Sequence, residues 1–404
     1  MININERRLR MEQWVVVTAV VVLGVATIVS PVETQGQQAM PVFEVDTSWP
    51  QPLPYNWTVG HVPSVAVDSR DHAFVLTRPN TLPPEERARA APPVIELDPD
   101  GNFVNGWGGP GIAGFDWPDS EHGIAIDHRD NVWVGGSAPV APSLRDLNDD
   151  MLLKFTYDGQ FLLQIGGRDM NTGNKDTRSV HQSADVFVYA QTNEAFVADG
   201  YGNRRVIVFD ADNGAFKRMW GGFGNEPIDA PAAAPGSSGQ ERPALETEGP
   251  GPQQFGGPVH GIKVSNDGMV YVADRSNRRV QVFSVDGEYI DQMFLNRAGP
   301  SPMSAAGVAF SPDPDQQFLY ISDYGNSRVA VVERKTLSLL YQFGERSSEP
   351  GDFAGVHSLA VDSQGNIYTA EVAPGARMQR FLYKGMSRTL PPNALTPDQL
   401  AGNE

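Results

Sequence analysis

Six copies of one strand pattern follow each other along this chain of 404 residues, and no other feature limits its fold as strongly. In each copy, two short runs of alternating apolar residues flank a tight turn rich in Gly, Asp or Asn, and a third and usually a fourth run follow. The clearest copy is PVHGIKVSNDGMVYVADRSNRRVQVFSVDGEYIDQMF, residues 258–294. Repeats of about 40 to 50 residues with four short strands are typical of propeller blades, so the sequence predicts an all-β, six-bladed β-propeller.

The two ends of the repeat array are complementary. The sixth copy, HSLAVDSQGNIYTAEV followed by MQRFLYKG, has no obvious fourth strand, whereas PVFEVD at residues 41–46 is a strand pattern without a copy of its own. We predict that this N-terminal strand completes the sixth blade, because closing the ring removes a free sheet edge. One propeller domain over residues 41–386 follows, with a low-complexity loop rich in Pro, Ala and Gly at 225–255 and a C-terminal tail at 387–404.

Residues 1–36 have the pattern of an export signal rather than of a propeller strand. Three arginines precede an apolar run at 14–29, and small and polar residues follow it up to Gly36. This order predicts a signal peptide, and an uncleaved N-terminal membrane anchor is the alternative. In both cases we expect the propeller outside the cytoplasm, in the periplasm or the extracellular space.

The composition excludes some functions and leaves others open. The formal net charge of −18 argues against a nucleic-acid partner, which would require basic patches that meet phosphates. The chain has no cysteine, so disulfides, thiolate metal ligands and cysteine nucleophiles are excluded. We expect a monomer with at most the one N-terminal membrane anchor.

One position in the innermost strand of each blade points to a metal site. In blade order this position holds Pro63, His122, Ala184, His260, Ala306 and His357. The three histidines fall in blades two, four and six, which lie about 120° apart in a six-bladed ring, so their side chains could converge on the central channel. A lone histidine at a strand start would more often bond a neighbouring turn, but three at this spacing predict a metal site. An imidazole-only site favours Zn²⁺, and three protein ligands leave a coordination position open, as in catalytic zinc sites.

Three further residues are expected on the same face of the ring. Arg78, Tyr201 and Arg275 lie where the second strands of their blades end, and the long connections emerge on that face too. Together they offer two cations for a carboxylate and a phenol for proton transfer. The other histidines, His61, His72, His128 and His181, show no such pattern and are predicted to be surface or turn residues.

The segments ADGYGNRRVIVF, ADRSNRRVQVF and SDYGNSRVAVV resemble NHL repeats, which form propellers. The wider pattern is similar to the peptidyl-α-hydroxyglycine α-amidating lyase family, over roughly residues 42–385. The resemblance rests on EHGIAID, VHGIKV and VHSLAVD around the three histidines, and on VLTRPN, DGYGNRR and DRSNRR. It implies zinc bound by His122, His260 and His357.

The same resemblance implies an activity and its residues. Tyr201 matches the catalytic tyrosine, Arg78 the active-site arginine and Arg275 a second arginine that binds substrate. The implied reaction cleaves the C–N bond of a carbinolamide, in a peptide or small molecule that bears a carboxylate, to an amide and glyoxylate. The family's aspartate for a structural calcium is replaced by Ser358, which puts Ca²⁺ in doubt, and the family's paired cysteines are absent.

Two other functions remain open at this stage. The first is a non-catalytic NHL-repeat propeller that binds proteins or ligands outside the cytoplasm, because a fold does not fix a function. It predicts either no metal or a metal without dependence on Tyr201. The second is a metal-dependent hydrolase like the lactonase-type propellers. It ranks lower because those enzymes bind their cation through carboxylates and Asn, whereas the channel positions here hold histidine.

Overall fold

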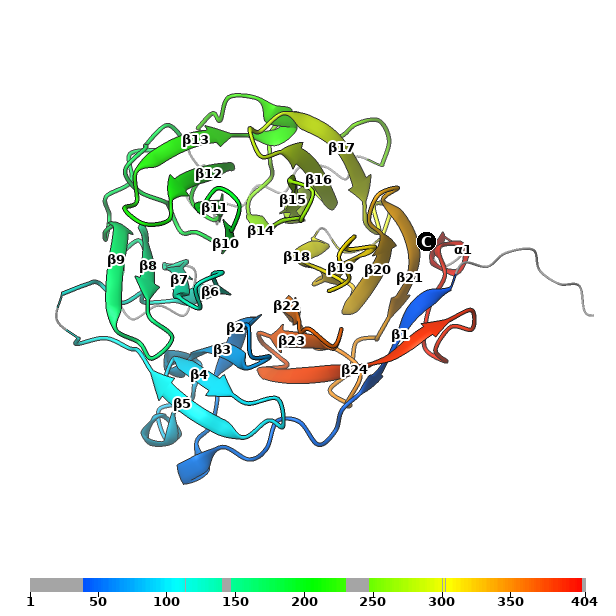
Figure 1. The fold of residues 1–404 in the computed structure, drawn as a ribbon, viewed down its shortest axis with the longest axis horizontal. Coiled ribbons are helices and arrows are strands. Elements are labelled where there is room, and N and C mark those ends of the chain that lie inside the picture. The colour runs from blue at the N-terminus through cyan, green and yellow to red at the C-terminus, as the bar shows by residue number, and fades with distance from the viewer. Residues whose placement is uncertain are drawn as a thin grey trace, which may run out of the picture. The chain divides into compact units, whose positions relative to one another are not determined.

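Six antiparallel sheets of four strands each stand around a ring in the computed structural model, which describes residues 39–112, 114–139, 147–229, 247–299, 301 and 303–401 (Figure 1). The predicted six-bladed propeller is therefore confirmed. The predicted signal at 1–36, the last residues of the tail and the middle of the loop at 225–255 lie outside the described residues. No described helix is long and apolar enough to cross a membrane.

The first three blades run along the chain in order, each from the channel outwards. Their strands are, in blade one, β2(His61–Val67), β3(Ala73–Arg78), β4(Val94–Leu97) and β5(Phe103–Trp107); in blade two, β6(Glu121–Ile126), β7(Val132–Gly136), β8(Met151–Phe155) and β9(Phe161–Gly166); and in blade three, β10(Asp185–Tyr189), β11(Glu194–Asp199), β12(Arg205–Asp210) and β13(Phe216–Trp220).

The last three blades repeat this order and close the ring. Their strands are, in blade four, β14(Val259–Val264), β15(Met269–Asp274), β16(Arg279–Ser284) and β17(Tyr289–Phe294); in blade five, β18(Ala305–Phe310), β19(Phe318–Asp323), β20(Arg328–Glu333) and β21(Ser338–Phe343); and in blade six, β22(Val356–Val361), β23(Ile367–Glu371), β24(Arg377–Ser387) and β1(Met40–Val45). The helical elements are short: η1(Pro54–Asn56), η2(Pro79–Thr81), η3(Arg87–Arg89), η4(Gly222–Gly224), η5(Arg275–Asn277) and α1(Pro397–Ala401).

The core of the propeller lies between the blades. Each of its six buried clusters joins apolar side chains from two neighbouring sheets, and one of them joins blade six to blade one. Both faces of a blade are therefore covered, which explains why the inner strands are apolar along nearly their whole length. A blade removed from the ring would expose both of these faces to water.

The N-terminal strand closes the ring as the sequence predicts. Strand β1 pairs antiparallel with β24, with Phe43 opposite Tyr383. The ring of Phe43 stacks on Phe343 at 5.8 Å and meets the edge of Tyr320 at 5.5 Å, so β1 also packs onto blade five. The tail packs there too, since Leu395 pairs with Gln342 of β21.

We predict that Phe43→Ala lowers the free energy of unfolding by about 2 kcal/mol. The substitution removes a half-buried ring from the aromatic cluster that joins two blades. Chemical denaturation of the full chain measures the loss. Val104→Ala, on the outer strand β5, is the matched control because Val104 is 46% exposed. Equal losses in the two variants would show that the closing strand contributes little to stability.

Candidate metal centre

The three predicted histidines converge in the central channel. They lie on β6, β14 and β22, the innermost strands of blades two, four and six, and each is at most 4% exposed. One nitrogen from each ring lies within 4.8 Å of the others. The ring centroids of His122, His260 and His357 are 4.4–5.1 Å apart. They line a cavity of about 10 Å³, which suits a single atom.

Each imidazole is oriented by a main-chain carbonyl of the next blade. Nδ1 of His122 donates to the carbonyl of Ala184 at 2.8 Å. In the same way, His260 donates to Ala306 at 3.0 Å and His357 donates to Pro63 at 2.7 Å. The acceptors occupy the same aligned position in the three blades that lack a histidine there. Because a carbonyl can only accept, Nδ1 carries the proton of the neutral ring and Nε2 is left as a lone pair.

The donor set fits a bound cation. The Nε2 atoms of His260 and His357 lie 3.0 Å apart, and two unprotonated nitrogens at this distance repel each other unless a positive charge lies beside them. Burial, followed by neighbouring arginines and histidines, lowers the pKa of all three rings well below the usual value, so they are neutral at pH 7. Zinc binds imidazole nitrogens at about 2.0–2.1 Å, which places tetrahedral ligands about 3.3 Å apart, close to the 3.0 Å between the Nε2 atoms of His260 and His357.

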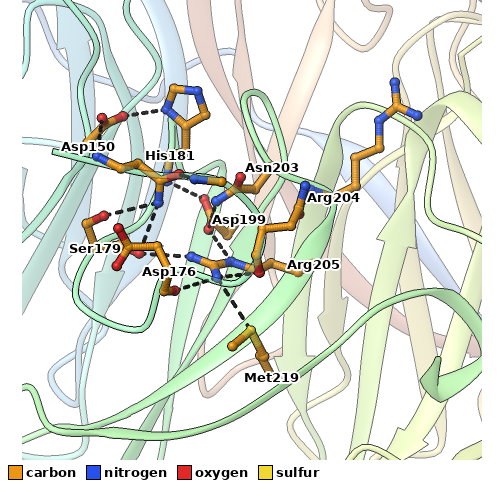
Figure 2. A network of polar contacts seen from close by, with 12 residues as sticks. Asp150, Asp176, Ser179, His181, Asp199, Asn203, Arg204, Arg205 and Met219 are labelled. Atoms are coloured by element: carbon orange, nitrogen blue, oxygen red, sulfur yellow. Dashed lines mark hydrogen bonds and ion pairs between the residues drawn. The ribbon is translucent and has the colours of Figure 1, made fainter. Parts of the chain in front are cut away.

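Tyr201 is the phenol nearest to this cluster. Its hydroxyl donates to Nε2 of His122 at 2.9 Å, and the two rings lie 4.7 Å apart. The turn that carries Tyr201 follows β11, whose last residue, Asp199, forms a fully buried ion pair with Arg205 at 2.8 Å (Figure 2). Asp199 also accepts from Asn203, so the turn is tied at both ends.

Arg205 binds the preceding connection as well as Asp199. Its terminal nitrogens donate to the main-chain carbonyls of Asp176 at 2.6 Å and Ser179 at 2.9 Å (Figure 2). They also donate to the carbonyl of Asn174 at 2.7 Å. These hydrogen bonds and the ion pair offset the free energy that the guanidinium loses when it is removed from water. The two side chains of the ion pair therefore have a structural role, since they fix the geometry of the turn that carries Tyr201.

Both predicted arginines lie beside the centre. Arg78, at the end of β3, is buried and donates from Nε to the carbonyl of Glu121 at 2.5 Å, and burial lowers its pKa. Arg275 places its guanidinium 5.6 Å from the ring of Tyr201. Within the described part of the chain, no carboxylate lies within ion-pair distance of either guanidinium, and Nε of Arg275 is buried without an acceptor.

Three residues near the site were not predicted from the sequence. Tyr324 lies under Arg275 at 5.3 Å, with its ring 5.9 Å from that of His357. Its segment, DYGNSR, is a visible counterpart of DGYGNRR. Glu121, beside His122, is buried against Trp117, and burial raises its pKa to about 7.

Some of the histidines predicted to be plain surface or turn residues have specific partners. His61 is the third missed residue: it lies opposite Arg78 in the β2–β3 register, and burial and that arginine lower its pKa. His72 contacts Glu96 at 2.8 Å, and His181 contacts Asp150 at 2.6 Å. No sequence pattern indicates these pairs, because the two partners come from separate strands and loops.

Comparisons with known proteins agree with the repeat pattern. The model of the NHL repeat family matches residues 259–283. NHL repeat-containing protein 3 of Mus musculus is 25% identical over 85% of this chain and 84% of its own length. Peptidyl-glycine alpha-amidating monooxygenase B of Xenopus laevis is 28% identical over 62% of this chain and 26% of its own length. A probable peptidyl-alpha-hydroxyglycine alpha-amidating lyase of Caenorhabditis elegans is 27% identical over 63% and 61%.

These findings confirm the resemblance to NHL-repeat propellers and to proteins named amidating lyases. The chain spans about a quarter of the length of the frog protein and about three fifths of the nematode protein. The relatives therefore support an NHL-repeat propeller and do not by themselves assign an activity to this chain.

We predict that the metal-free protein becomes less stable as the pH falls below about 6.5, because the unfolded chain protonates three histidines that stay neutral when folded. The contribution reaches about 1.4 kcal/mol per pH unit for each ring. Urea unfolding between pH 5 and 7 measures how steeply the free energy of unfolding falls as the pH is lowered. In His260→Gln this dependence should be weaker by the contribution of one ring, about 1.4 kcal/mol per pH unit. The exposed His128, changed to Gln, is the control. If the slopes of the two variants are identical, the buried rings do not resist protonation.

Proposed function

We propose that this protein is a zinc-dependent lyase of the amidating type, which cleaves the C–N bond of a carbinolamide and releases an amide and glyoxylate. The observation that carries the proposal is the convergence of three buried imidazoles, each oriented by a carbonyl, with the hydroxyl of Tyr201 beside them. The names of the relatives favour this chemistry over other reactions of a three-histidine zinc site.

His122, His260 and His357 would hold the metal, and when bound it would supply Lewis acidity toward a substrate oxygen. With the metal on Nε2 of His122, the oxygen of Tyr201 would no longer donate to that ring, and as a phenolate beside it Tyr201 would take the proton from the carbinolamide hydroxyl. The C–O bond then becomes a carbonyl, the C–N bond breaks, and the departing nitrogen receives its electron pair and a proton. One carbinolamide thus gives one amide and one aldehyde acid.

Arg78 and Arg275 would bind the substrate carboxylate. Each is at most 6% exposed, and a buried guanidinium without a carboxylate partner favours an anionic ligand. The buried Nε of Arg275, which has no acceptor among the described residues, is a donor suited to a carboxylate oxygen. A peptide or small molecule that ends in α-hydroxyglycine has this charge.

The proposal does not include calcium. The hydroxyl of Ser358, where the family has an aspartate, lies 3.3 Å from that of Ser64. The neighbouring carboxylate, Asp185, is occupied by an ion pair with Lys263 at 2.8 Å. Two hydroxyls and a paired carboxylate are a weak donor set for a cation that prefers several carboxylate oxygens.

We further propose that the protein acts outside the cytoplasm, on the arginines and the apolar run within residues 1–36. A second candidate function is a non-catalytic binding propeller. It is favoured by NHL repeat-containing protein 3, the relative cited above that aligns over most of both chains and whose name states no activity.

We predict that the purified full chain binds one zinc ion and cleaves an α-hydroxyglycine peptide to its amide and glyoxylate. Each of His122→Ala, His260→Ala and His357→Ala should weaken zinc binding more than about 100-fold, because the loss of a ligand exceeds the effect of losing an outer partner. Tyr201→Phe should keep the zinc and lose about 10²–10⁴-fold in kcat. Elemental analysis and product chromatography measure the two results.

His128→Ala is the control for these variants, because His128 is exposed and does not belong to the cluster. A zinc-loaded wild type that releases no glyoxylate would contradict the lyase and leave the binding propeller. A folded wild type that takes up no zinc would contradict the metal centre itself.

A further inference from the structure

A second histidine–carboxylate pair lies close to the turn of Tyr201. His181, in the connection between blades two and three, donates from Nδ1 to Asp150 at 2.6 Å (Figure 2). Asp150 directly precedes β8 of blade two, and its side chain is 1% exposed, whereas that of His181 is 26% exposed. The pair therefore ties the connection to blade two.

The main chain beside this pair holds the turn of Tyr201. The amide of Tyr201 donates to the carbonyl of Gln182 at 3.2 Å, and that of Gly202 to the carbonyl of His181 at 3.0 Å. The amide of His181 in turn donates to Asp199 at 2.7 Å. The segment thus binds the turn at both sides of the tyrosine.

The same segment also orients a ligand of the metal centre. Two residues after Gln182, the carbonyl of Ala184 accepts from Nδ1 of His122. A shift of residues 181–184 would therefore move both Tyr201 and the imidazole that its hydroxyl contacts. The distance between hydroxyl and imidazole depends on where this segment is anchored.

The imidazole of His181 also packs on the turn itself. A Cβ atom at Gly202 would lie 2.0 Å from Cδ2 of the ring, so the ring lies directly against this glycine. The backbone of Gly202 is not in the left-handed region, and contact with the ring is the reason for a glycine here. The side chain of His181 thus fixes the residue that follows Tyr201.

Burial alone would lower the pKa of His181, but the hydrogen bond and charge of Asp150, with Asp199 behind it, outweigh burial and the opposing charge of Arg205 and raise it. The raised pKa means that the ion pair is fully formed below about pH 6.5 and is lost as the pH rises through the folded-state value. At neutral pH the pair therefore keeps more of its charge than an isolated histidine would.

Blade four has a corresponding turn, which is one residue shorter and lacks the histidine. There the amide of Gly256 donates to Asp274 at 2.8 Å, as the amide of His181 does to Asp199. Asp274 also pairs with Arg279 at 2.8 Å. The ion pair with Asp150 is thus an addition to the common turn, in the blade that presents Tyr201.

We propose that His181, anchored by Asp150, is a positioning residue that holds the Tyr201 hydroxyl against the histidine cluster. The proposal rests on the proposed function for its effect on catalysis, but its effect on the turn can be measured without any reaction.

The test compares the full-length wild type with Asp150→Asn and His181→Gln, which remove the ion pair and change the volume little. Amide hydrogen exchange at pH 7 should become at least about tenfold faster at residues 200–204 in both variants. Residues 275–278, the equivalent turn of blade four, should keep the wild-type rate and serve as the internal control. His72→Gln, which breaks a similar pair elsewhere, should change neither turn.

A steric test separates packing from charge. Gly202→Ala should speed exchange of the turn because the new methyl group meets the ring of His181. The double variant His181→Ala, Gly202→Ala should exchange more slowly than the sum of the two single changes predicts, because each removes the other's clash or void. Additive effects would show that the ring does not set the turn.

If the wild type is an active lyase, kcat should fall about tenfold in both ion-pair variants with KM within about twofold, since a shifted general base lowers turnover without weakening binding. In Asp150→Asn, the pH above which kcat declines should be lower than in the wild type, because Asp150 no longer raises the pKa of His181. Unchanged exchange at residues 200–204 would overturn the positioning role. An inactive wild type with the expected exchange pattern would overturn only the lyase.

Discussion

Every ring of the histidine cluster depends on a hydrogen bond to a main-chain carbonyl one blade further on. For His122 and His260 the acceptor follows in sequence, but His357 of blade six bonds to Pro63 of blade one. That last bond exists only when the ring is closed, and closure depends on β1 pairing with β24. The cluster is therefore a property of the whole propeller, because no single blade holds two of its rings.

The side chains of the cluster and around it favour ligands of particular charge. Three neutral imidazoles offer lone pairs to a cation, while Arg78 and Arg275, both buried, add positive charge beside them. Burial, with the arginines and the neighbouring histidines adding to it, lowers the pKa of the rings and keeps them available as ligands. An anionic substrate would compensate both the metal and the arginines, although the whole chain carries a net charge of −18.

The sequence predicted what repeats and missed what does not. The three histidines occupy equivalent strand positions, so a single alignment placed them at one end of the channel, and the unmatched strand at 41–46 indicated the closure. Tyr324 was not predicted because it directly follows Asp323, whereas Tyr201 lies two residues after Asp199, so the two tyrosines do not align. The partner of His181 escaped for a stronger reason: Asp150 lies in another blade, and no periodicity links two loops that meet only after folding.

The division of labour between strands and turns explains how a symmetric ring can be used asymmetrically. The inner strands supply three nearly equivalent imidazoles, which alone would present the same chemistry from three directions. The turns after the second strands break this symmetry, because blade three presents Tyr201, blade four Arg275 and blade five Tyr324. In the proposed lyase, a substrate that approached from this face would meet a phenol and a cation in fixed order, so the turns, rather than the strands, would determine its orientation.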